Sequence, residues 1–151
     1  MLIRRALVIS AFTFAALAAN QIAGTWKLNV AKSKYTGIPA PKASIVTYTP
    51  QGQGWKYDAK GTTADGQPSN ITFVYDKDGA ESMMTGNPYA DTITIQKGNT
   101  DSSTAIFKRG GKAIGTAKRT ISPNGKTMTV SASLTLADGK KASYTAVYDK
   151  Q

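Results

Sequence analysis

The chain has 151 residues, with 19 Lys and Arg, nine Asp and Glu, and neither His nor Cys. A protein of this length is expected to form one domain. The absence of His and Cys excludes histidine-assisted nucleophiles, cysteine nucleophiles, disulfides and zinc sites with nitrogen or sulfur ligands. Since the acids lie mainly in turns rather than as inward pairs, we expect no catalytic residue, no metal ion and no cofactor.

Residues 1–19, MLIRRALVISAFTFAALAA, have the pattern of a secretory signal peptide. Two arginines precede an apolar run from Ala6 to Leu17, which ends in the small-x-small form of a cleavage site. The run is shorter than the roughly 20 residues that span a membrane, although an uncleaved N-terminal anchor is the alternative. We therefore expect residues 20–151 to form an exported domain, periplasmic or secreted, without stable membrane insertion.

From Gly24 onward the apolar residues alternate with a period of two, and turn signals such as Asp-Gly and Asn-Gly recur between the alternating runs. Residues 31–42 form the one long connection, and their two prolines predict an extended segment rather than a helix. The expected strands are 24–31, 43–49, 54–62, 68–76, 80–85, 91–97, 103–109, 112–121, 126–136 and 140–149.

This meander of short strands predicts an all-β chain. A single antiparallel up-and-down barrel of about 8–10 strands, without a helical lid, would remove the unpaired sheet edges. A sandwich of two sheets is the competing architecture.

Alternation along the strands predicts which side chains face the interior. On 112–121, Arg119 shares the expected inward face with Ala113, Gly115 and Ala117, whereas Ile114 is expected to face outward. A buried guanidinium needs a carboxylate, a hydroxyl, a carbonyl, an aromatic ring or a ligand anion. The inward sets of other strands are Trp26, Leu28 and Val30; Trp55, Tyr57 and Ala59; Ile71, Phe73 and Tyr75; and Tyr144, Ala146 and Tyr148.

The sequence Gly24-Thr25-Trp26, followed by an arginine late in the chain, resembles the calycin superfamily of lipocalins and fatty-acid-binding proteins. In that superfamily Gly-x-Trp opens the first strand, and a late arginine packs across the tryptophan and closes one end of the barrel. The resemblance therefore implies barrel closure by Gly24, Trp26 and Arg119, with the guanidinium over the indole ring.

The C-terminal stretches 117–130 and 144–150 resemble the last three strands of fatty-acid-binding proteins. The chain also resembles small exported bacterial lipocalin-like proteins that begin with GTWKLN and end with VYDK. Two departures stand out. The place of the helical lid holds only about a dozen residues with two prolines, and Ala146 stands where an arginine would complete a carboxylate clamp with Tyr148.

The inward positions mix bulky aromatic residues with small ones, which is compatible with a cavity or with a filled core. The leading prediction is an exported, non-catalytic barrel that binds a small hydrophobic or amphipathic ligand. The alternative is a solid barrel whose basic surface meets an envelope polymer or protein. The candidate ligand-binding residues are Arg119, Tyr148, Tyr144, Trp55, Tyr57 and Phe73.

Outside residues 1–19 the chain keeps 17 basic residues against nine acidic ones, a net charge of +8. The lysines are dispersed, as on an ordinary solvated surface. On 54–62, Lys56 and Lys60 lie on the face opposite to Trp55 and Tyr57, so basic and aromatic side chains do not share a platform. We therefore expect no nucleic-acid partner.

Overall fold

A computed structural model describes residues 21–98 and 101–151, and the expected signal peptide therefore lies outside the described residues. No helix in the described ranges is long and apolar enough to cross a membrane. The elements are β1 (Gly24–Leu28), the short 3-10 helix η1 (Val30–Lys32), β2 (Lys34–Thr36), β3 (Ala43–Gln51), β4 (Gly54–Thr62), β5 (Pro68–Tyr75), β6 (Glu81–Met83), β7 (Thr92–Gly98), β8 (Ser102–Arg109), β9 (Lys112–Ile121), β10 (Thr127–Thr135) and β11 (Lys141–Lys150).

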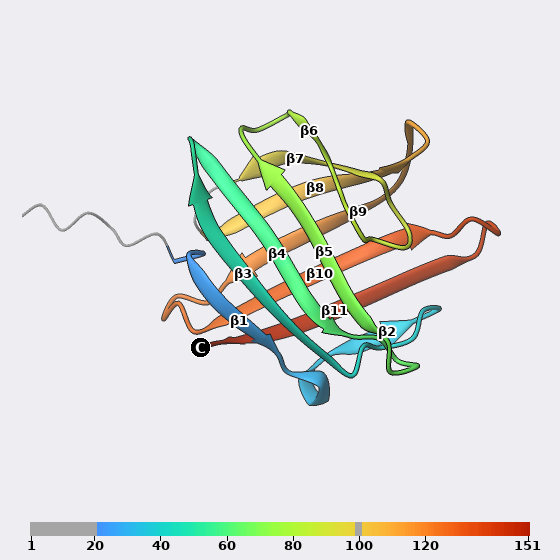
Figure 1. The fold of residues 1–151 in the computed structure, drawn as a ribbon, viewed down its shortest axis with the longest axis horizontal. Helices are drawn as coiled ribbons and strands as arrows, with labels where there is room; N and C mark the ends of the chain where they lie inside the picture. The colour runs from blue at the N-terminus through green and yellow to red at the C-terminus, as the bar shows by residue number, and fades with distance from the viewer. Residues whose placement is uncertain (1–20, 99–100) are drawn as a thin grey trace, which may run out of the picture.

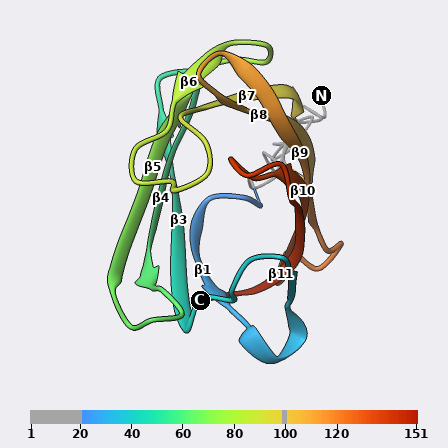
Figure 2. The same ribbon diagram turned by 90° about the vertical axis from the view of Figure 1, so that its right-hand side faces the viewer.

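All strand pairs are antiparallel, in the order β5-β4-β3-β1-β11-β10-β9-β8-β7-β6, with β2 also paired to β11. The sheet curls until its two ends meet, with β3–β5 on one side and β8–β11 on the other (Figures 1 and 2). At the seam, Thr72 and Thr85 exchange backbone hydrogen bonds of 3.0 and 2.9 Å. The predicted antiparallel barrel without a helical lid is confirmed for the described residues.

β1 and β2 are two parts of one interrupted strand beside β11. Leu28 pairs with Tyr148, and the ladder resumes where Lys34 pairs with Thr145. The single turn η1 lies between them, so the expectation of a purely extended segment after the first strand was wrong. Val30, expected to point inward, belongs to this turn and is 44% exposed.

Ser33 repairs the ladder at this interruption. Its Oγ accepts a hydrogen bond of 2.9 Å from the Val147 amide and donates one of 2.7 Å to the Asn29 carbonyl. The Ser33 hydroxyl thus replaces a backbone carbonyl as hydrogen-bond acceptor. The chain can therefore leave the sheet for one turn while the Val147 amide keeps a hydrogen bond.

A β-bulge in β9 reverses two of the predicted orientations. Phe107 pairs with Gly115 and Lys108 with Ala113, so Ile114 is an extra residue in the ladder. The bulge turns Ile114 inward, where it is 7% exposed, and leaves Ala113 exposed. The predictions for these two side chains were wrong because strict alternation holds only while the register is unbroken.

Gly115 allows β10 to lie close to the bulge. A Cβ at this position would lie 2.2 Å from the Ser133 carbonyl oxygen. After the bulge, side chains of β9 again alternate between the two faces of the sheet. Ala117 and Arg119 therefore face the interior as predicted.

Two hydrophobic clusters form the core of the described part of the chain. One surrounds Trp26, which has no exposed surface, and includes Ile22, Val46, Ala59, Ile121 and Met128. The other is built around Phe107 and includes Met84, Ala90, Ile93, Ala105, Ile114, Ala132, Leu134 and Ala142.

Candidate ligand-binding site

The barrel encloses a cavity of about 1030 Å³, whose wall takes residues from both hydrophobic clusters. The sequence left a filled core and a hollow one as alternatives, and the structure has a hollow one. The wall includes all six candidate ligand-binding residues: Arg119, Tyr148, Tyr144, Trp55, Tyr57 and Phe73.

An aromatic row crosses β3, β4 and β5 on the inner face. Tyr48 pairs with Tyr57, which in turn pairs with Phe73, so the three rings come from directly opposed positions. Tyr57 and Phe73 stack with centroids 4.6 Å apart, and Tyr48 meets Tyr57 edge-on at 5.3 Å. Such cross-strand aromatic pairs stabilise the sheet and hold the rings in fixed orientations along the wall.

A second stacked pair lies where β2 runs along β11. The rings of Tyr35 and Tyr144 are 5.5 Å apart and nearly parallel. Both residues line the cavity, so β2 contributes to its wall although it is only three residues long. Sequence analysis missed Tyr35 because it treated this segment as a connection.

The cavity tyrosines keep some accessible surface toward the hollow, yet protein surrounds them. Burial raises the pKa of Tyr48 to about 12, against a partial opposing effect of the Arg119 charge. Burial likewise raises the pKa of Tyr57, Tyr144 and Tyr148 above the usual value for tyrosine. At neutral pH these residues are therefore uncharged hydroxyls, each able to donate one hydrogen bond and to accept others.

Arg119 is the one buried charged residue in the described core, at 8% exposure. Its Nε donates a hydrogen bond of 3.2 Å to Ser103 Oγ on β8. Burial lowers the pKa of the guanidinium, whereas Tyr48, Asp101 and Tyr75 raise it. Since an arginine stays protonated at neutral pH, this position keeps a positive charge at the cavity wall.

The cavity wall is otherwise nearly free of charge. Of the described residues that line it, Arg119 is the only Lys or Arg, and Asp65 is the only Asp or Glu. Asp65 is exposed in the turn between β4 and β5. In the described part of the chain, no three acidic side chains gather closely enough to hold a metal ion.

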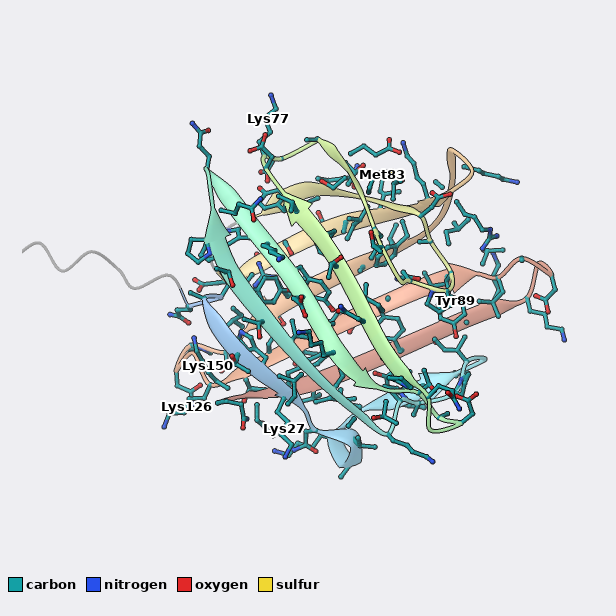
Figure 3. The ribbon with its side chains drawn as sticks, viewed as in Figure 1. Lys27, Lys77, Met83, Tyr89, Lys126 and Lys150 are labelled. Atoms are coloured by element: carbon teal, nitrogen blue, oxygen red, sulfur yellow. The ribbon has the colours of Figure 1, made fainter. Side chains whose placement is uncertain are left out.

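Lys150 lies over Trp26, a contact that the sequence resemblance did not suggest. Its Nζ is 4.8 Å from the ring centroid, and Trp26 pairs directly with Lys150 between β1 and β11. The indole Nε1 donates to the Ile22 carbonyl at 2.9 Å. Gly24, with φ of +111°, opens the strand beside the Lys150 side chain. The labelled Lys150 lies near Lys126 at this end of the barrel (Figure 3).

Sequence analysis also missed Tyr48 and Ser103 as candidate site residues. Tyr48 could have been predicted from the alternation of its strand, because it lies two residues after Val46 and both line the cavity. Ser103 could not have been predicted in this way, because its place beside Arg119 depends on the pairing of β8 with β9.

Among the comparisons with known proteins, one solved structure supports this fold. The sequence matches no protein-family model and no curated protein. The structure is similar to zebrafish ileal bile acid-binding protein complexed with cholic acid, with a TM-score of 0.54, 13% identity, and coverage of 87% of this chain and 99% of that one. It is also matched to a redesigned β-barrel bound to DFHBI, with a TM-score of 0.45, 16% identity, and coverage of 88% and 98%. A match to the siderocalin Ex-FABP has a TM-score of 0.39, 12% identity, and coverage of 87% and 74%.

The strand order and the likeness to the zebrafish protein together define a calycin-like barrel. The expectation drawn from Gly24-Thr25-Trp26 and from the C-terminal stretches is confirmed at the level of the fold.

Proposed function

We propose that this chain is an exported, non-catalytic carrier that holds a small amphipathic anion in the barrel cavity. The observation that carries the proposal is the guanidinium of Arg119, the one buried cation among the described residues, on the wall of an otherwise largely apolar and aromatic cavity of about 1030 Å³. A volume of this order accommodates a ligand of drug or lipid size.

The charge balance of the wall favours an anionic head group. Asp101 and two tyrosines already stabilise the charge of Arg119, since they raise its pKa. Arg119 is also the only Lys or Arg among the described residues of the wall, and the one acid there, Asp65, is exposed, so a carboxylate or sulfate would be attracted to the guanidinium. The hydroxyls of Tyr48 and Ser103 are donors on the same part of the wall. The missing clamp arginine at Ala146 leaves Arg119 as the cation for this role.

The apolar part of the ligand would lie against the aromatic row of Tyr48, Tyr57 and Phe73. These rings offer a rigid apolar surface that needs little further ordering upon binding. The zebrafish protein of similar fold is complexed with cholic acid, which supports a carrier of amphipathic molecules on this fold.

Two ligands that differ only in the head group test the proposal. Dodecanoate and dodecanol should both bind, with dodecanoate tighter by about ten- to a hundredfold, because a hydrogen bond to a charged group contributes about 1.5–3 kcal/mol. Arg119→Gln should abolish this preference while leaving dodecanol binding nearly unchanged. Lys112→Gln, which removes an exposed positive charge, is the matched control and should keep the preference.

Titration calorimetry supplies the affinities, and thermal unfolding of each variant shows whether it is folded. Equal affinities for acid and alcohol in the unmodified protein would refute an anion site. Native mass spectrometry of protein recovered from its host's periplasm supplies two further checks. Loss of the mass of the N-terminal segment would support export, and a discrete mass released upon denaturation would identify the ligand.

A further inference from the structure

The outer face of β8–β11 and β2 presents polar side chains in aligned rows, pointing away from the cavity. Cross-strand register brings the first row together from five strands: Thr104, Lys118, Ser131, Thr145 and Lys34. The next row continues the array with Thr116, Ser133, Ser143 and Thr36. All nine side chains are exposed. We call these two rows the hydroxyl face.

The hydroxyl face is hollowed rather than convex. A groove of about 690 Å³ runs over it, and all nine of its residues line the groove. No Asp or Glu of the described chain lines this groove, whereas two lysines do. The surface therefore combines a shallow recess, seven hydroxyls and an uncompensated positive charge.

We propose that the hydroxyl face binds an acidic polysaccharide. Each Ser or Thr hydroxyl donates one hydrogen bond and accepts up to two, as does each hydroxyl of a sugar, so the two surfaces are complementary whichever way each hydroxyl rotates. Lys34 and Lys118 lie three strand spacings apart in one row, roughly 14 Å at about 4.8 Å per strand. Anionic groups that recur along a polymer can therefore reach both.

The composition of the face favours a glycan over other large partners. Protein interfaces concentrate aromatic residues and arginine at their centre, and single-stranded nucleic acids are held by stacking on aromatic rings. The two rows contain neither kind of residue. Hydroxyls with a few lysines match a hydrated, negatively charged, hydroxyl-rich chain.

None of the nine side chains of the hydroxyl face lines the cavity, although Ala105, Ala117 and Tyr144 line both the groove and the cavity. Lys118 points outward and is exposed, while its neighbour Arg119 points inward and is buried. Variants of the hydroxyl face therefore leave the cavity wall intact, and the two proposals can fail independently.

Polygalacturonate, with neutral dextran as its uncharged counterpart, tests the proposal by titration calorimetry at low salt. The double variant Lys34→Gln/Lys118→Gln should weaken polygalacturonate binding about five- to tenfold, as expected for two exposed charge contacts. The double variant Lys27→Gln/Lys56→Gln removes the same charge from exposed positions on β1 and β4 and should change the affinity less than twofold. Lys27 points away from the barrel (Figure 3).

A second pair of variants isolates the hydroxyls from the charge. Thr116→Val/Thr145→Val keeps shape and charge, and should weaken binding at least threefold. Thermal unfolding of every variant should stay unchanged, which shows that each one is folded whether or not the cavity binds a ligand.

Four results would overturn the proposal: no binding of polygalacturonate, equal binding of dextran, equal losses in the two lysine pairs, or an unaffected threonine variant. Tighter binding of a polythymidine strand would assign the face to nucleic acid instead and would equally overturn it.

Discussion

Raising the pH above 10 is expected to destabilise the barrel through the tyrosines of its cavity. Burial raises the pKa of Tyr48 from 10.0 to about 12. The folded chain therefore retains this proton over a pH range in which the unfolded chain releases it. The stabilisation is fully present below pH 10 and is lost as the pH rises from 10 through 12. At about 1.4 kcal/mol per pH unit, Tyr48 alone accounts for a loss of at most about 2–3 kcal/mol.

The other buried tyrosines act in the same direction. The pKa of Tyr57, Tyr144 and Tyr148 is also raised, chiefly by burial. Because a domain of this size is stabilised by only about 5–15 kcal/mol, the combined loss should bring the barrel close to unfolding at strongly alkaline pH.

Urea unfolding at pH 8 and pH 11, followed by tryptophan fluorescence, measures this loss. The near-ultraviolet absorbance of tyrosinate, recorded in parallel, shows when the phenols ionise. Tyr48→Phe keeps the ring and removes the titrating group, so its free energy of unfolding should fall less steeply with pH. If the native tyrosines ionise near pH 10 while stability stays constant, they are solvated and the reasoning from a protein-enclosed cavity is wrong.

Two substitutions test the seam and the strand interruption. Gly86→Ala should lower the free energy of unfolding by about 3 kcal/mol or more, because a Cβ there would lie 1.9 Å from the Asn70 carbonyl oxygen at the seam. Gly79→Ala is the control, since Gly79 has the same φ of +80° but open space around it, and should lower this free energy by only about 1 kcal/mol. Equal losses in urea unfolding would show that the clash at the seam is relieved without cost. Ser33→Ala should cost about 1–2 kcal/mol and accelerate hydrogen exchange at the Val147 amide, whose acceptor it removes; an unchanged exchange rate would contradict the repair role of this hydroxyl.

Local pattern was sufficient to predict the barrel and much of its inner wall. Alternation placed Tyr57, Phe73 and Arg119 on the cavity wall because inward and outward residues of a half-buried strand differ in polarity. The bulge at Ile114 escaped prediction because it depends on how many residues the partner strand β8 contributes at that point. The residues around Ile114 do not reveal how many residues of β8 will pair with them.

Two further features also depend on long-range pairing. Lys150 lies over Trp26 because β1 pairs with β11, a contact that the resemblance did not suggest. The segment after β1 looked like a connection because its three-residue strand β2 has no pattern of its own and is defined by its pairing with β11.

The pairing of β1 with β11 also determines when the barrel can close during synthesis. β1 leaves the ribosome long before its partner β11, and until they meet Trp26 has no Lys150 beside it. β11 also supplies Tyr144 and Tyr148 to the inner wall. A nascent chain can therefore form hairpins early, but the wall of the cavity is complete only after β11 has joined β1.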